Sequence, residues 1–140
     1  MNGKDVLITG GAGFIGSHLV ERLRKENDVR VLDTFATGPR SNISSLPDEQ
    51  VIEGSVTNRS IVEEAVAGAD IVLHLAAMMG VKRTLENPLE VLEVNIDGTR
   101  TVLEASVDAG VERVLHELLQ RRARTLEHLS SRYSVHHVIW

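Results

Sequence analysis

One stretch near the N-terminus constrains the fold more than any other. A short apolar run at residues 6–8 leads into three glycines spaced three apart, and an amphipathic run follows them. These glycines are Gly10, Gly13 and Gly16. Glycine accepts positive φ and has no Cβ, so the chain can turn sharply and a ligand can approach closely. We predict a strand, a glycine turn and a helix whose first N–H groups and positive dipole end face a pyrophosphate.

The glycine spacing alone leaves a purely structural turn open, because glycines also mark ordinary turns. The context favours a dinucleotide site, since the glycines follow a strand-like run and open a helix-like one. A second apolar run, residues 29–32, ends at Asp33. This places a carboxylate about 20 residues beyond the turn, where an acid that binds a ribose is expected.

Short apolar runs and helical patterns alternate along the rest of the chain. The apolar runs typical of buried parallel strands are residues 6–8, 29–32, 51–53, 71–75 and 111–114. Helical spacing of apolar residues predicts helices over residues 14–25, 58–67 and 88–109, and Gly110 is suited to end the last one. This alternation predicts an α/β fold with a doubly wound parallel sheet. We expect strand order 3-2-1-4-5, with the ligand at the carboxyl ends of strands 1 and 4.

Composition narrows the classes of partner. The chain has 140 residues, a formal net charge of -5 and no cysteine. The lack of cysteine excludes a disulfide framework, a thiolate zinc site and a cysteine nucleophile. No basic block stands out, which argues against a nucleic-acid partner held by phosphate contacts. No apolar run approaches the length of a membrane span and no signal-peptide pattern follows Met1, so we expect no membrane partner and a cytoplasmic location.

Four motifs, in this order, resemble one family. They are residues 9–16 (TGGAGFIG), Asp33, residues 74–77 (HLAA) and residues 95–99 (NIDGT). Together they resemble the extended short-chain dehydrogenase/reductases, in the branch of nucleotide-sugar epimerases and dehydratases that includes the UDP-glucose 4-epimerases. The resemblance covers residues 1–114. It implies a Rossmann-like domain that holds NAD, and a sugar nucleotide that is oxidised transiently at its sugar ring.

The resemblance also implies which residues contact the cofactor. They lie in the glycine turn, at the end of the second strand and in the loop after it, after the third strand beside the expected adenine, at the end of the fourth strand, and in the last helix. The residues are Gly10, Gly13, Phe14, Ile15, Gly16, Asp33, Thr37, Gly38, Ser55, Val56, Leu75, Ala76, Ala77 and Asn95. Asp33 is expected to bind the adenosine ribose hydroxyls, and its carboxylate would repel a 2′-phosphate, which favours NAD over NADP. Ser55 replaces the acid that the family usually has beside adenine, which weakens that assignment.

Several of these positions also have a structural interpretation. Arg40 is either a partner of a 2′-phosphate or, as we favour, a solvated loop charge. His74 is either catalytic or, as we favour, a strand residue with one satisfied ring nitrogen. Asn95 either supports the active site or has no part in it, and residues 75–77 also fit the end of a buried strand. Met78, Met79 and Lys82 lie where the family contacts nicotinamide and substrate. The alternative interpretation of these three residues is an adaptable loop without such a contact.

Residues 115–140 depart from the family pattern. The family's chemistry rests on a Ser or Thr and a Tyr-x-x-x-Lys pair beyond the fifth strand. Here Tyr133 is the only tyrosine and His137 stands four residues later, so we expect no catalytic residue in this chain and no metal site. We predict a helix over residues 115–124. When residues 115–124 are back-translated with GC-rich codons and the reading frame is shifted by one base, the new translation resembles the serine-rich segment of the family. The tail is therefore either out of frame, truncated or a divergent helix.

Three functions remain open at this point. The first is the NAD-binding part of a nucleotide-sugar epimerase or dehydratase, with a nucleotide sugar as the partner of the full-length family member. The second is a non-catalytic NAD-binding module or fragment, and the third is an interaction protein whose tail helix packs on a partner. The missing Tyr-x-x-x-Lys favours binding without turnover for these residues alone. The oligomeric state is left open.

Overall fold

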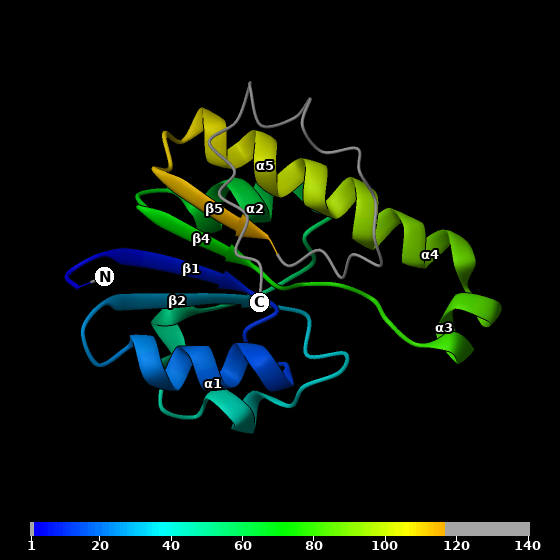
Figure 1. Ribbon diagram of the computed structural model, residues 1–140, viewed down its shortest axis with the longest axis horizontal. Helices are drawn as coiled ribbons and strands as arrows, with labels where there is room; N and C mark the ends of the chain where they lie inside the picture. The colour runs from blue at the N-terminus through cyan, green and yellow to red at the C-terminus, as the bar shows by residue number, and fades with distance from the viewer. Residues whose placement is uncertain (1, 117–140) are drawn as a thin grey trace, which may run out of the picture.

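The computed structural model describes residues 2–116, which form a five-stranded sheet between two layers of helices (Figure 1). The strands are β1 (Asp5–Thr9), β2 (Asp28–Asp33), β3 (Val51–Glu53), β4 (Ile71–His74) and β5 (Arg113–His116). All neighbouring strands are parallel, in the order β3-β2-β1-β4-β5. The prediction of a doubly wound, Rossmann-like sheet with order 3-2-1-4-5 is confirmed.

Helices cover both faces of the sheet, as the alternating pattern requires. The helices are α1 (Phe14–Leu23), η1 (Arg40–Ile43), η2 (Asp48–Gln50), α2 (Arg59–Val66), α3 (Val81–Glu86), α4 (Pro88–Leu92), η3 (Glu93–Gly98) and α5 (Thr99–Asp108). Because side chains alternate along a strand, Val6 and Ile8 of β1 pack with α1, whereas Leu7 packs with α2 and α5. β1 is therefore buried on both faces, which explains its continuous apolar sequence.

The long helix predicted over residues 88–109 forms as three consecutive segments. It begins with Pro88 at the first helical position of α4, passes through the π-helical segment η3 and ends at Asp108 of α5. Gly110 follows with φ of 73°, the left-handed conformation expected at a helix end. The sequence pattern did not reveal η3. Single π turns inside α-helices are frequently found at functional sites, and Asn95 lies inside this one.

The fifth strand lies two residues later than predicted, which corrects the start of the predicted tail helix. Leu115 pairs with Leu73 and His116 with His74 in the parallel register of β5 on β4. These two residues are therefore strand residues, because the exposed edge of β4 offers hydrogen-bond partners that override a local helical pattern. The rest of that predicted helix, with Tyr133 and His137, lies outside the described residues. The division of the chain at residue 114 stays a prediction.

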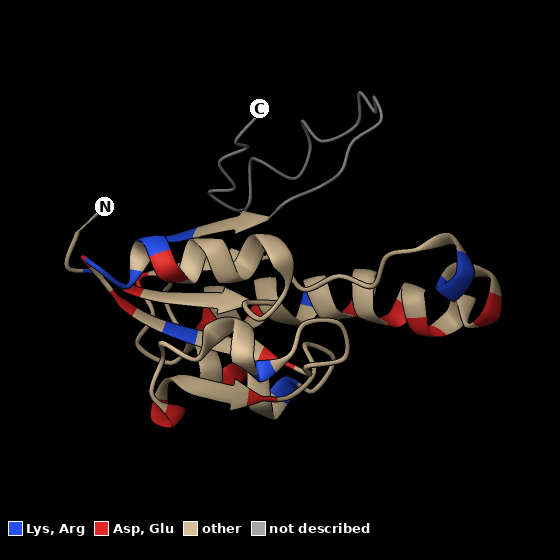
Figure 2. Cartoon of the chain, turned by 90° about the horizontal axis from the view of Figure 1, so that it is seen from below, with Lys and Arg blue, Asp and Glu red and all other residues tan. Residues whose placement is uncertain are grey.

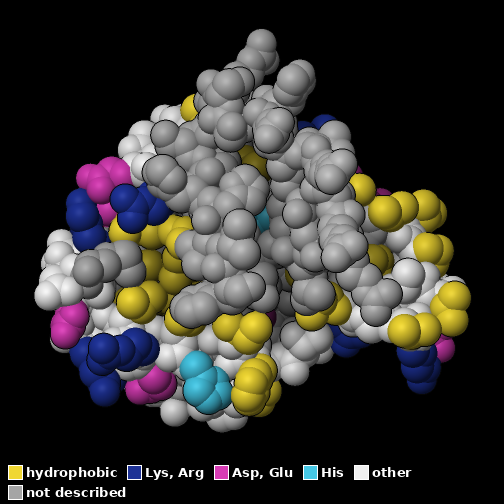
Figure 3. Space-filling view, in the orientation of Figure 1, with side chains coloured by type: hydrophobic (Ala, Val, Ile, Leu, Met, Phe, Trp, Pro, Cys, Tyr) yellow, Lys and Arg dark blue, Asp and Glu magenta, His cyan; other side chains and the backbone are white. Residues whose placement is uncertain are grey.

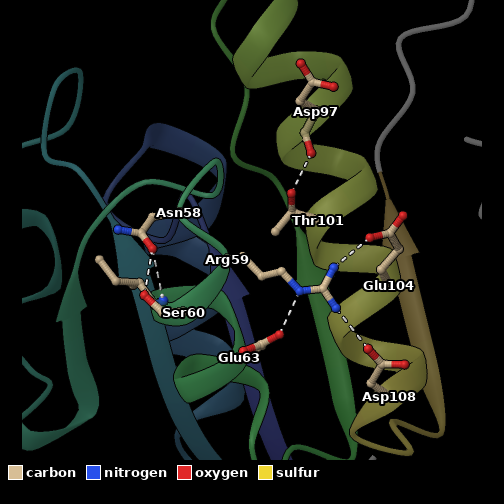
Figure 4. Close-up of polar contacts among 9 residues, drawn as sticks. Asn58, Arg59, Ser60, Glu63, Asp97, Thr101, Glu104 and Asp108 are labelled. Carbon is tan, nitrogen blue, oxygen red and sulfur yellow. Dashed lines mark hydrogen bonds and ion pairs between the residues drawn. The ribbon is translucent and has the colours of Figure 1, made fainter.

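One arginine links α2 and α5 at the surface of their layer, above the apolar core that the two helices share (Figure 4). Arg59 of α2 contacts Glu63 of its own helix at 2.7 Å, and reaches across to Glu104 at 2.8 Å and Asp108 at 3.0 Å in α5. The side chains of Glu63 and Glu104 are about half exposed and that of Asp108 is 67% exposed, so each single pair contributes little to stability. The network joins α2 to two points one turn apart on α5.

An arm formed by residues 79–98 extends beyond the carboxyl ends of the strands (Figure 1). Apolar side chains gather on this arm in the space-filling view (Figure 3). The exposed ones are Met79, Val81, Leu85, Leu89, Leu92 and Ile96. A row of this kind is typical of a surface that another structural element covers. Basic and acidic residues are interleaved along the chain, the arm included (Figure 2). Within residues 2–116, no helix is long and apolar enough to cross a membrane.

Ser106 in α5 supplies a test of the packing between this helix and the sheet. Its side chain is 1% exposed, and its Oγ has no hydrogen-bond partner. We predict that Ser106→Ala raises the free energy of unfolding by about 1 kcal/mol, because a buried hydroxyl without a partner is removed and alanine is the better helix former. Denaturant unfolding measures the change.

Ser17→Ala in α1 is the matched control. It gives the same gain in helix propensity, but it removes a hydrogen bond from Ser17 Oγ to the Phe14 carbonyl at 3.1 Å. We compare the change in the free energy of unfolding of the two variants. If Ser106→Ala raises it no more than Ser17→Ala does, the Ser106 hydroxyl is not destabilising.

Candidate functional site

The glycine turn between β1 and α1 depends on two close backbone approaches. Gly10 has φ of 73°, and a Cβ on it would lie 2.7 Å from the Ala76 nitrogen after β4. A Cβ on Gly16 would overlap the Gly10 carbonyl, so the first turn of α1 rests directly on the glycine turn. The turn itself is closed by the Gly13 N–H, which donates to the Gly10 carbonyl at 3.2 Å. Only glycine fits at Gly10 and Gly16 without moving the backbone.

The N-terminus of α1 presents free donors. Gly13 occupies the cap position, and no side chain there accepts a hydrogen bond from the helix. The first helical bond runs from the Ser17 N–H to the Gly13 carbonyl at 2.9 Å, so the N–H groups of Phe14, Ile15 and Gly16 precede it. The first turn carries no acidic residue, and the Phe14 and Ile15 side chains are exposed. This end of the helix suits an anion such as a phosphate.

Asp33 lies at the carboxyl end of β2, beside this turn. Its Oδ2 accepts a hydrogen bond from the Ala12 N–H at 2.8 Å, and its Oδ1 accepts one from the Phe35 N–H at 2.8 Å. The residue is 9% exposed, and Phe35 adopts φ of 57°. A carboxylate has about four acceptor positions, so two remain for hydroxyl groups of a ligand. The carboxylate therefore holds the turn and can still bind a ribose.

The loop after β2 packs on the glycine turn. Gly38 is buried, and a Cβ on it would overlap the Ala12 carbonyl, whereas the neighbouring Thr37 is exposed. Asn42 of η1 donates its amide to the same Ala12 carbonyl at 2.8 Å. The structure thus brings Gly38 against the glycine turn and leaves Thr37 at the surface of the loop.

Arg40 in this loop is not the solvated charge that we favoured. Its guanidinium donates to the carbonyl of Ile43 at 2.7 Å and to the carbonyl of Leu46 at 3.0 Å, and it pairs with Asp48 at 2.9 Å. The sequence could not show this, because these carbonyls are positioned only when the 3₁₀ turns form. Most of the donor capacity of Arg40 is therefore directed into its own loop.

The residues expected beside adenine follow β3. Val56 is 4% exposed and packs in the core with α2 and α5, and a Cβ on Gly98 would approach its side chain to 2.5 Å. Ser55 is half-buried, and its Oγ lies 2.8 Å from Thr57 Oγ1. Val56 thus shapes the core beneath this loop, and Ser55 offers a neutral hydroxyl at its surface.

His74 at the end of β4 belongs to a buried chain of hydrogen bonds. Its Nδ1 lies 2.6 Å from Thr9 Oγ1, and its Nε2 lies 3.1 Å from Thr99 Oγ1. The Thr99 hydroxyl donates to the Asn95 carbonyl at 2.7 Å, so its oxygen accepts the His74 Nε2 proton. Thr9 Oγ1 accepts the Ala76 N–H at 3.3 Å and can donate its own proton to Nδ1. This network assigns a neutral His74 with its proton on Nε2.

The structural interpretation of His74 is therefore confirmed, and both ring nitrogens are satisfied rather than one. Its side chain is 1% exposed. Burial, and after it the nearby His116, lowers the pKa of His74 to about 3. The two rings stack with centroids 4.8 Å apart. His74 is thus a fixed, uncharged connection between β1, β4 and the long helix.

Asn95 in η3 holds the start of the loop that follows β4. Its Oδ1 accepts the Met78 N–H at 2.8 Å, and its Nδ2 donates to the Met78 carbonyl at 2.9 Å. Asn95 therefore binds the backbone of this loop as a neighbouring strand would. β4 ends at His74, so residues 75–77 follow the strand instead of forming its end. Leu75 and Ala76 are half-buried and pack against the two cores, while Ala77, Met79 and Lys82 are exposed.

Comparison with known proteins identifies this arrangement. Residues 6–117 match the model of the NAD dependent epimerase/dehydratase family. The chain belongs to this family.

Relatives agree with the match. A UDP-N-acetyl-alpha-D-glucosaminuronate decarboxylase from Bacillus cytotoxicus is 43% identical over 106 residues, which are 74% of this chain and 33% of that protein. A dTDP-glucose 4,6-dehydratase from Streptomyces venezuelae, solved with NAD bound, is 34% identical with a TM-score of 0.74, over 80% of this chain and 38% of that one. A Thermus thermophilus UDP-glucose 4-epimerase in complex with NAD is 39% identical with a TM-score of 0.69, over 79% of this chain and 36% of that one. The chain spans about a third of the length of the curated relatives it matches.

Sequence reasoning missed three polar residues of this epimerase/dehydratase family domain: Thr9, Asn42 and Thr99. All three act through hydrogen bonds to segments that are distant in sequence. Thr9 gave a signal that could have been used, because it is a hydroxyl residue at the end of an otherwise apolar, buried strand. A buried polar side chain requires a partner, and His74 ends the strand beside it.

The neutral His74 makes the stability of this domain pH dependent. The pKa of His74 is about 6.5 in the unfolded chain and about 3 in the folded chain. Between pH 3 and pH 6.5 the unfolded state therefore binds more protons than the folded state. Stability is therefore full above about pH 6.5 and falls as the pH drops. We predict a loss of about 2 kcal/mol from His74 between pH 7.5 and pH 5, measured by denaturant unfolding.

His74→Gln should reduce this slope, because glutamine does not titrate, whatever its effect on the absolute stability. His18→Gln is the matched control at an exposed histidine of α1. An unchanged slope in His74→Gln would show that His74 is not buried in its neutral form.

Proposed function

We propose that this chain is the NAD-binding part of an NAD-dependent nucleotide-sugar epimerase or dehydratase. One observation carries the proposal: the uncapped first turn of α1 and the Asp33 carboxylate lie side by side at the carboxyl edge of the sheet, joined through Ala12. Family membership and relatives that bind NAD support it.

The residues present offer hydrogen-bonding groups that suit NAD. The N–H groups of Phe14, Ile15 and Gly16 would bind the pyrophosphate, and Asp33 would bind the adenosine ribose hydroxyls. The other residues proposed to line the cofactor are Gly10, Gly13, Thr37, Gly38, Ser55, Val56, Leu75, Ala76, Ala77 and Asn95. NAD, when bound, supplies a hydride acceptor for the sugar carbon. The chain's own contribution is to bind and orient this acceptor.

Relatives named for UDP-sugars and dTDP-glucose support a nucleotide sugar as the substrate class of the whole protein. We expect the nucleotide sugar to bind near the loop after β4. Asn95 holds this loop through hydrogen bonds to the Met78 backbone. A cytoplasmic location and the lack of nucleic-acid or membrane partners stay predictions.

We predict that the chain binds NAD more tightly than NADP. The Asp33 carboxylate repels a 2′-phosphate, and the Arg40 guanidinium, which could attract one, is directed into its own loop. Asp33→Ala should weaken NAD binding about tenfold or more, and it should narrow the difference between NAD and NADP. Isothermal titration calorimetry measures both affinities, and tighter binding of NADP by the unmutated chain would disprove the preference.

The alternative is a non-catalytic NAD-binding module, and one observation favours it. His74, which the family motif of residues 74–77 places at the end of β4, is buried and neutral, so it cannot act as a general base on a sugar. We therefore predict that this 140-residue chain binds NAD but does not turn over UDP-glucose, UDP-galactose or dTDP-glucose. Product analysis after incubation with NAD tests this. Turnover that is lost in Tyr133→Phe would show that the chain carries its own acid–base group.

A further inference from the structure

The peptide groups of Ala12, in the middle of the glycine turn, are held from two sides. Asp33 Oδ2 accepts the Ala12 N–H at 2.8 Å, and Asn42 Nδ2 donates to the Ala12 carbonyl at 2.8 Å. Ala12 is fully buried, with 0% of its surface exposed. We call these three residues the Ala12 clamp. It joins the turn to residues 21 and 30 positions away in the sequence.

Asn42 is presented by a rigid segment rather than by a free loop. Its own N–H donates to the Pro39 carbonyl at 2.9 Å in the turn η1, and Ile43 next to it is fully buried. Arg40 binds the carbonyls of Ile43 and Leu46 from the other side of the same turn. The amide of Asn42 is therefore positioned before any ligand binds.

The clamp determines the direction of the donors in α1. In a trans peptide the C=O and the following N–H point in opposite directions, so fixing the Ala12 carbonyl also fixes the Gly13 N–H. That N–H donates to the Gly10 carbonyl at 3.2 Å, which closes the turn. Asn42 and Gly10 thus hold the two ends of one peptide unit. The next residues, Phe14 and Ile15, carry the free N–H groups of the helix.

We propose that Asn42 is a positioning residue for phosphate binding at the N-terminus of α1. It acts through the Ala12 carbonyl and requires an amide donor, because a carboxylate at this position would face a carbonyl oxygen. The inference rests on the proposed function, since it assumes that the pyrophosphate of the cofactor binds at this turn. It predicts that Asn42 affects ligands that carry phosphates and leaves a nucleoside unaffected.

The test compares ADP, which has a pyrophosphate, with adenosine, which has none. Asn42→Ala and Asn42→Asp in the 140-residue chain should weaken ADP binding roughly five- to tenfold, while adenosine affinity stays within about twofold of the unmutated value. Calorimetry suits ADP, and NMR shift titration suits adenosine, which binds more weakly. Asp33→Ala should weaken both ligands, because Asp33 holds the turn and also faces the ribose. Ser41→Ala, at the exposed neighbour of Asn42 in η1, is the matched control and should change neither.

The outcomes separate this inference from the proposed function. An unmutated chain that binds neither ADP nor adenosine would remove the proposed function, and the role of Asn42 with it. If the chain binds ADP but Asn42→Ala and Asn42→Asp change the ADP affinity by less than twofold, only the role of Asn42 is overturned. An equal loss of both ligands would show that Asn42 only maintains the fold. Asn42→Asp has the shape of the native residue and carries the test if the alanine variant does not fold.

Discussion

The parallel pairing of β1 with β2 and β4 is the constraint on which the site depends. In this register Thr9 lies beside Leu32 on one side and His74 on the other, so the three strands end at one edge of the sheet. The glycine turn, Asp33 and the loop after β4 therefore start from neighbouring points. A slip of one residue in any of these strands would turn its side chains to the opposite face and separate these groups.

The same edge combines two kinds of polar interaction that serve different purposes. At β1 and β4, Thr9 and His74 belong to a neutral, buried chain in which every donor meets one acceptor. At β2, the Asp33 carboxylate accepts hydrogen bonds from two backbone N–H groups and has acceptor positions left for a ligand. The first arrangement fixes the framework, and the second leaves capacity for binding. An anion can bind here although the chain has a formal net charge of -5, because the free N–H groups of α1 act at short range.

Local patterns predicted the features that local forces determine. The order of elements, the glycine turn and the helix end at Gly110 follow from hydrophobic spacing and from φ preferences of single residues. The predictions that needed correction depended on distant partners. Leu115 and His116 pair with β4 instead of starting a helix, and Arg40 binds carbonyls of its folded loop instead of water. No window of sequence contains these partners, because each is brought close only by a turn or a crossover.

The sequence by itself determined the fold class and the strand order, because buried strands, amphipathic helices and a glycine turn admit few arrangements. It also identified the family through four short motifs. Only the tertiary structure decided what several of these residues do. It made His74 a neutral connection rather than a base, Asn95 a holder of the Met78 backbone and Asn42 a partner of Ala12. The physical reason is that a hydrogen bond requires two groups within about 3 Å, and folding alone brings these pairs together.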